Sequence, residues 1–118
     1  MSALVCLCTC PSEDVALSLA RGVVEAELAA CVNVVPGVRS IYRWEGRVNE
    51  DAELLLVLKT TAEAYPALQA HLLAAHPYTC PEVLALPVAA GSEAYLAWLH
   101  GSVSAGSSQL GRGDAAPP

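Results

Sequence analysis

The chain has 118 residues, of which 54% are hydrophobic and 15% are charged, and its formal charge at pH 7 is −6. This length predicts a single domain. The acidic balance argues against nucleic acid and anionic membranes as partners, because phosphate binding relies on clustered Lys and Arg. The sequence has neither the roughly 20-residue apolar run that spans a bilayer nor the basic start of a signal peptide, so we expect a cytoplasmic protein.

The first part of the chain is predicted to form a strand, a helix and a second strand. An apolar run predicts a strand over Ala3–Cys8. Ser12 can cap a helix whose first turn holds two acidic residues, and apolar residues at helical spacing extend this helix to about Ala30. A β-rich stretch follows over Cys31–Val35.

A long β-hairpin is predicted next. Pro36-Gly37 must bend or interrupt the strand, which resumes with alternating residues over Val38–Val48. Asn49-Glu50-Asp51 is predicted to be a polar turn. Leu54–Leu58 is apolar on both faces, as is typical of a central strand.

The last elements are a helix, an edge strand and a short helix. Thr60 and Glu63 have the spacing of a capping box, which predicts a helix from about Ala62 to Ala75, or from a later start if Pro66 lies in its first turn. Prolines flank a strand over Glu82–Leu86, which suits an edge position. Ser92 and Glu93 open a third helix that Gly101 closes. We expect one domain over residues 1–103 and a flexible tail, rich in Gly, Ser, Ala and Pro, over residues 104–118.

The order βαββαβ plus a helix predicts an α+β, ferredoxin-like fold with the first and third strands in the centre. Two helices can cover only one face of a four-stranded sheet, and the other face is also apolar. Either the third helix or another copy of the chain must cover that face. We therefore expect a closed ring of subunits, a trimer or a dimer.

Several motifs lie between residues 3 and 103, namely Thr9-Cys10-Pro11-Ser12-Glu13, Leu28-Ala29-Ala30-Cys31-Val32-Asn33, Pro36-Gly37, Ser40-Ile41-Tyr42-Arg43-Trp44-Glu45-Gly46, Lys59-Thr60-Thr61, His76-Pro77-Tyr78, Pro81-Glu82 and Tyr95-Leu96-Ala97-Trp98. In their order and spacing these motifs resemble the CutA divalent-cation-tolerance family. The resemblance implies a homotrimer of ferredoxin-like subunits, similar in architecture to the PII signalling proteins. It also implies a role in tolerance of divalent metals, copper above all, with no established reaction.

The resemblance further implies metal ligands, namely a cysteine in the first strand and a pair of histidines before Pro-Tyr. Cys8 and His76 match two of these positions, whereas Ala75 stands at the third. Thiolate and imidazole suit soft ions such as copper, so we expect copper or another divalent cation and no organic cofactor. The alternative is that Cys8 is a small hydrophobic core residue and that His76 caps a helix or faces solvent.

Cysteines alternate at positions 6, 8 and 10, so their side chains share one face of the first strand. Of the three, Cys10 at the strand end is the one expected to meet solvent. The five cysteines are odd in number and sit among apolar residues, which indicates reduced thiols rather than a disulfide framework.

Aromatic residues suggest a second site, a cleft between subunits that binds a small molecule. Its walls would be aromatic, and Lys59 and Glu82 would orient the ligand. The alternative is that the aromatic residues only fill an interface. The predicted wall residues are Tyr42, Trp44, Tyr78 and Trp98.

Three classes of function follow from these sites. The first is a metal-binding trimer, with a metal ion or small molecule and other copies of the chain as its partners. The second is a PII-like adaptor that binds a small molecule. The third is an enzyme with a Cys–His pair, which we do not expect because the sequence lacks an Asn or Asp partner motif, a phosphate loop and paired metal motifs.

Overall fold

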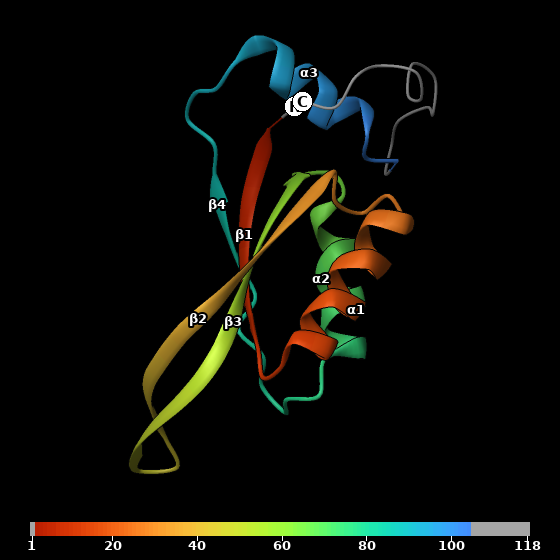
Figure 1. The fold of residues 1–118 in the computed structure, drawn as a ribbon. Coiled ribbons are helices and arrows are strands. Elements are labelled where there is room, and N and C mark those ends of the chain that lie inside the picture. Colours follow the sequence, from red (N-terminus) through yellow and green to blue (C-terminus); the bar gives the residue numbers. More distant parts are fainter. Residues whose placement is uncertain (1, 105–118) are drawn as a thin grey trace.

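The computed structural model describes residues 2–104, which form one antiparallel sheet with two helices on one of its faces (Figure 1). Its strand order is β2-β3-β1-β4, so β1 and β3 are central. This confirms the predicted α+β, ferredoxin-like topology. Except for Ser104, the predicted tail lies outside the described residues. The elements are β1 (Ala3–Cys10), α1 (Glu13–Glu25), β2 (Cys31–Trp44), β3 (Arg47–Thr61), α2 (Tyr65–Ala75), β4 (Leu84–Pro87) and α3 (Glu93–Gly101).

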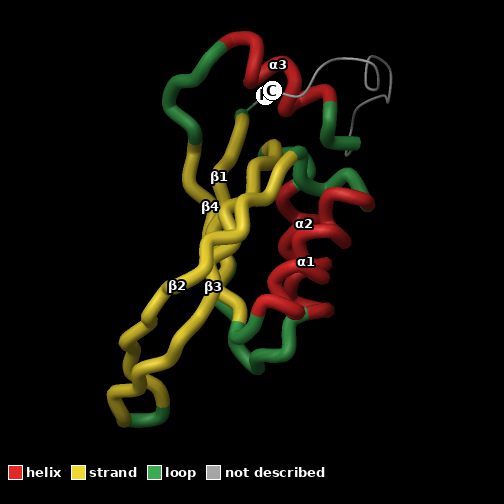
Figure 2. The backbone as a smooth tube through the Cα atoms, viewed as in Figure 1, coloured by secondary structure: helices red, strands yellow, loops and turns green. Residues whose placement is uncertain are grey.

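The core lies between the sheet and the helices α1 and α2, which run along one face of the sheet (Figure 2). Cys6 pairs with Leu58 and Cys8 pairs with Leu56, and all four side chains are fully buried. The alternating cysteines of β1 therefore share the helix-facing side, as predicted. The side chains that complete this core from the two helices are Ala16, Leu19, Ala20, Val23, Leu68 and Leu72.

Helix α1 begins as predicted but ends earlier than predicted. The Ser12 side chain accepts a hydrogen bond from the Val15 amide at 3.3 Å. At the other end, the Leu28 amide donates to the Val23 carbonyl at 2.9 Å while Glu27 adopts a φ of 61°. This closing motif usually carries glycine at the left-handed position. Because a glutamate at this position does not indicate the end of a helix, the predicted helix extended to Ala30.

The β2–β3 hairpin is a pair of long strands that projects beyond the rest of the sheet (Figure 1). Pro36-Gly37 does interrupt the ladder, since the register shifts between Val35 and Val38. The predicted turn at Asn49–Asp51 is wrong, because these residues pair with β2. The chain reverses instead at Glu45-Gly46, where both residues have positive φ, as a tight two-residue hairpin turn requires.

Helix α2 begins at Tyr65, with Pro66 in its first turn, so the later of the two predicted starts is correct. The predicted capping box does not form, because Thr60 belongs to β3 and its hydroxyl donates to the Leu28 carbonyl at 2.7 Å. Strand β4 pairs only with β1 and is an edge strand, as predicted. Helix α3 begins as predicted, with the Ser92 side chain as its cap.

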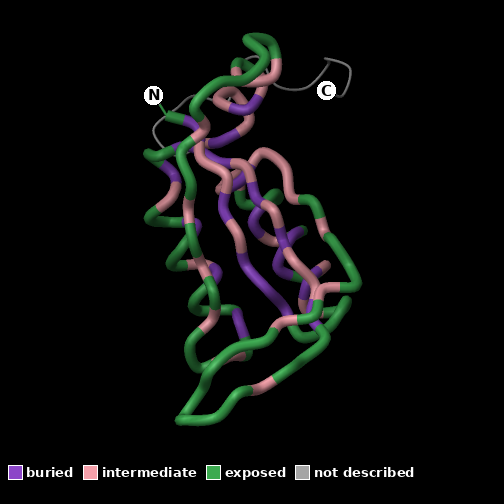
Figure 3. The backbone as a smooth tube through the Cα atoms, turned by 90° about the vertical axis from the view of Figure 1, so that its left-hand side faces the viewer, coloured by how far each residue is buried: buried purple, intermediate pink, exposed green. Residues whose placement is uncertain are grey.

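The sheet face opposite α1 and α2 is apolar and remains partly exposed. Because side chains alternate along a strand, this face carries Val5 and Leu7 of β1 and Leu55 and Val57 of β3. Leu84 and Leu86 on β4 are about half exposed. Figure 3 shows that exposure continues along the projecting hairpin. No helix within residues 2–104 has the length and hydropathy to cross a membrane.

Candidate metal centre and adjoining cleft

Three side chains of types that can ligate metals meet at one end of the core. Cys8 and Cys10 come from the helix-facing side of β1, and His76 is the cap residue at the end of α2. Their sulfur and ring nitrogen atoms all lie within 4.8 Å of one another. Both cysteines are 0% exposed and His76 is 7% exposed. The fold thus brings the two predicted ligands, Cys8 and His76, together and adds Cys10.

Pro77 and two hydrogen bonds fix the orientation of His76. A residue before proline favours extended backbone, and His76 has φ −79° and ψ 139°, which ends α2 there. The Tyr78 amide donates to His76 Nδ1 at 3.2 Å, so Nδ1 carries no proton. His76 Nε2 therefore holds the proton of the neutral ring and donates it to the Thr9 carbonyl at 2.8 Å. A metal-binding histidine is commonly oriented by such a bond from its other nitrogen.

The two thiols differ in how readily they ionise. A hydrogen bond between Cys8 and Cys10 raises the pKa of Cys8 well above its usual range, and burial and the nearby Glu82 and Glu53 raise it further. The same bond lowers the pKa of Cys10. Cys10 is therefore the first thiol to become the thiolate form that binds metals. Burial alone raises the pKa of Cys6 to about 11, and Cys6 lies outside the cluster.

A cleft of about 750 Å³ opens beside this cluster, between the hairpin and the loop that joins α2 to β4. Tyr42 and Trp44 of β2 and Tyr78 of the loop supply aromatic walls. Glu53 of β3 and Glu82 supply carboxylates. Thr9 also lines the cleft, and its carbonyl accepts the bond from His76, so the cleft and the cluster share a wall.

Tyr78 links the cleft to the cluster. Its ring centroid lies 4.7 Å from that of His76, and its hydroxyl donates to Glu53 Oε2 at 2.6 Å. Burial first, and then this carboxylate, raise the pKa of Tyr78 well above its usual range. Tyr42 donates in the same way to Asp51, and that hydrogen bond raises its pKa. Both phenols therefore remain protonated donors at neutral pH.

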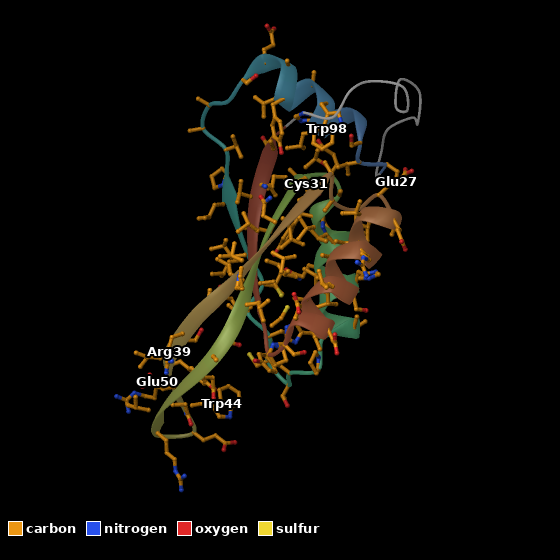
Figure 4. The ribbon with its side chains drawn as sticks, viewed as in Figure 1. Glu27, Cys31, Arg39, Trp44, Glu50 and Trp98 are labelled. Carbon is orange, nitrogen blue, oxygen red and sulfur yellow. The ribbon has the colours of Figure 1, made fainter. Side chains whose placement is uncertain are left out.

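Two predicted cleft residues lie elsewhere in the chain. The Lys59 ammonium group contacts Asn33 and lies 3.8 Å from the Cys31 sulfur. The Trp98 ring lies 5.4 Å from the ring of Tyr95. Figure 4 shows Trp98 and Cys31 at the opposite end of the sheet from Trp44. Within one chain the cleft therefore contains Tyr42, Trp44, Tyr78 and Glu82 of the predicted set, without Lys59 and Trp98.

Sequence reasoning missed two residues of this region. Cys10 was expected to meet solvent, and this is wrong, because the chain beyond β1 folds back and the residue is fully buried. Cys10 alternates with Cys8 along the strand, and this was the sequence feature that could have predicted its burial. Glu53 is 8% exposed although it carries a carboxylate, and its place directly before the apolar run Leu54–Leu58 was the only hint of burial.

The sequence matches known proteins along nearly the whole described region. The CutA1 divalent ion tolerance protein family matches residues 4–102. The divalent-cation tolerance protein CutA of Thermus thermophilus is 58% identical over 96 residues, which cover 81% of this chain and 93% of that protein. Protein CutA of Mus musculus is 50% identical over 92 residues, and this chain spans only 52% of its length.

Solved structures agree with these matches. The divalent cation tolerance protein structure from Thermus thermophilus has a TM-score of 0.85 at 54% identity, over 86% of this chain and 99% of that one. CutA1 from Oryza sativa has the same TM-score at 44% identity, over 87% and 94% of the two chains. This agreement in sequence and topology shows that the chain belongs to the CutA1 divalent ion tolerance protein family.

Proposed function

We propose that this chain binds copper through Cys8, Cys10 and His76 and in this way contributes to tolerance of metal ions. The observation that carries the proposal is the convergence of two thiols and one imidazole within 4.8 Å in a buried site. The family description and the printed names of its relatives, which refer to divalent ion tolerance, support a role with metals.

The donor set suits copper, especially Cu(I). Thiolate ligands select soft ions, among them Cu(I) and zinc. Structural zinc almost always takes four ligands, whereas Cu(I) readily accepts three, which is the number gathered here. The family resemblance implies a histidine where this chain has Ala75, and Cys10 supplies a third donor in its place.

An ion entering this site must replace a contact of His76. The Tyr78 amide bond to Nδ1 is the longer of the two ring bonds, at 3.2 Å, and is the one that an ion would replace. The bond from Nε2 to the Thr9 carbonyl would remain and would hold the ring. Because Cys10 ionises before Cys8, loading should release protons and strengthen as the pH rises.

A competition titration tests the site. Reduced protein should take Cu(I) from a coloured chelator, and Cys8→Ala, Cys10→Ala and His76→Gln should each weaken binding by about a hundredfold or more, since even orienting residues contribute about 10–100-fold. Cys6→Ala is the matched control, because Cys6 is equally buried on the same strand face but lies outside the cluster. Equal affinity in all four variants would refute the assignment.

The same proposal includes assembly into a homotrimer. The apolar face around Leu84 and Leu86 is open in the single chain, and apolar patches of this kind mark interaction sites. The edge of β2 in the long hairpin is also available for pairing. Sedimentation equilibrium should give three times the 12.2 kDa chain mass. A stable 12.2 kDa species at micromolar concentration would contradict the trimer.

A second candidate function is that of a PII-like adaptor that binds a small molecule. The specific observation in its favour is the 750 Å³ cleft, whose aromatic walls are separate from the buried thiols. The two functions are distinguishable, because ligand binding in the cleft should survive Cys8→Ala. A copper-only protein would show no such binding.

We propose further that the chain is not an enzyme and works in the cytoplasm. The cysteines of the cluster are fully buried against His76, which leaves a substrate no access to a Cys–His pair. All five cysteines are free thiols, which suits a reducing compartment. Compounds that transfer an acyl group to reactive thiols should therefore give no covalent adduct on Cys8 or Cys10. An adduct on either residue, detected by mass spectrometry, would contradict this proposal.

A further inference from the structure

The cleft beside the metal cluster has an unbalanced charge. Within one chain, its lining includes the carboxylates of Glu53 and Glu82 but no Lys, Arg or His. A nearby carboxylate, that of Asp51, accepts the bond from Tyr42. Phosphate and carboxylate ligands are bound most strongly by cationic side chains, and none lines this wall within one chain. The negative electrostatic potential of the cleft instead favours a positively charged ligand.

Glu53 presents a largely buried carboxylate to this cleft. The residue is 8% exposed, and within residues 2–104 its only hydrogen bond comes from the Tyr78 hydroxyl at 2.6 Å. The single ion pair found among the described residues joins Arg39 to Glu50 and does not involve Glu53. Buried carboxylates are normally paired with a cation, so a guest that supplies one would satisfy Glu53.

Aromatic rings complete the recognition. In the single chain Tyr42 is 42% exposed and Trp44 is 47% exposed, and both line the same cleft as Tyr78. The phenol groups of Tyr42 and Tyr78 already donate to carboxylates, which leaves the ring faces as their remaining binding surface. Aromatic faces attract cations, and tryptophan does so most strongly.

We propose that this cleft binds a small organic ammonium ion, held by the carboxylates of Glu53 and Glu82 and by the faces of Tyr42, Trp44 and Tyr78. This inference rests on the second candidate function, the small-molecule cleft, and names the chemical class of its ligand. An ammonium ion on an apolar carbon body matches both the negative charge and the aromatic walls of the cleft. A nucleotide does not, because its negative phosphate would be repelled by both carboxylates.

The test compares ligands that differ only in charge. Choline and 3,3-dimethylbutan-1-ol have nearly the same shape, but only choline is a cation, and AMP serves as an anionic probe. Binding is followed by tryptophan fluorescence in a Trp98→Phe background, which leaves Trp44 as the only tryptophan. Choline should bind at least about tenfold more tightly than the alcohol, and added salt should weaken this binding.

Matched variants locate the charge that matters. Glu82→Gln and Glu53→Gln should each weaken choline binding by about tenfold, while Glu63→Gln, which removes an equal charge outside the cleft, should leave it unchanged. Because glutamine can still accept from Tyr78, Glu53→Gln should fold, and the exposed Glu82 offers a second variant that does not depend on the core.

The outcomes separate this inference from the function on which it rests. Equal binding of choline and its neutral analogue, or binding of AMP alone, would overturn the ammonium assignment while leaving a small-molecule cleft. Binding of none of the three probes would overturn the ammonium assignment and count against the adaptor function as well. Choline-selective binding that both glutamine variants weaken would support the proposal.

Discussion

Replacing Tyr78 by phenylalanine removes one oxygen atom and should destabilise the fold more than a surface change of the same kind. The hydroxyl gives Glu53 its only hydrogen bond within the described part of the chain, at 2.6 Å, and that glutamate is 8% exposed. A hydrogen bond to a charged group contributes about 1.5–3 kcal/mol, and loss of the donor leaves a buried carboxylate unsatisfied. We therefore expect Tyr78→Phe to lower the free energy of unfolding by about 1.5–3 kcal/mol.

Urea unfolding at pH 7 and constant protein concentration measures this change, since oligomer stability depends on concentration. Tyr65→Phe is the control, because its hydroxyl donates to Gln69 at 2.9 Å on the exposed surface and its loss should change stability by less than about 0.5 kcal/mol. A double-mutant cycle with Glu53→Ala, which removes the acceptor, should give a coupling of about 1 kcal/mol or more. Equal effects of the two phenylalanine variants, with additive behaviour in the cycle, would refute the placement of Tyr78.

Two further predictions concern the turn and the buried thiols. Glu45→Asn should raise the free energy of unfolding by about 0.5–1 kcal/mol, because Glu45 has a φ of 51° and asparagine tolerates this conformation better; an unchanged free energy of unfolding would contradict the turn geometry. Burial raises the pKa of Cys6 from 9.0 to about 11, so between these pH values the unfolded chain loses this proton while the folded chain keeps it. Stability should therefore fall as the pH rises through this window. In Cys6→Ala the urea midpoint should fall less steeply with pH than in the unmodified protein. An identical slope would contradict the contribution of the buried Cys6 thiol.

Much of the topology could be predicted because local signals and global packing agree. Ser12 followed by two acidic residues marks the start of α1, and the apolar run at Leu54–Leu58 marks a central strand. Errors arose where a residue takes an unusual conformation without the usual glycine. Glu27 closes α1 at positive φ, and Glu45 shares the hairpin turn with Gly46. Because glutamate is not typical of positive φ, neither position could be predicted from its residue type.

The candidate metal site was only half predictable. Family resemblance pointed to Cys8 and His76, and the fold does bring them together. Cys10 becomes a third candidate donor only because the fold places His76, at the end of α2, beside the end of β1. Strand alternation could place Cys10 on the same face as Cys8 but could not place it beside His76. The burial of Glu53 depends likewise on Tyr78, which lies 25 residues away in the chain.

X-ray absorption spectroscopy of the copper-loaded protein tests the proposed three-residue centre most directly. The centre formed by Cys8, Cys10 and His76 predicts two sulfur neighbours and one nitrogen neighbour around the ion, with one sulfur lost in Cys10→Ser. A first shell made only of nitrogen and oxygen, or an unchanged sulfur count in that variant, would show that copper binds elsewhere.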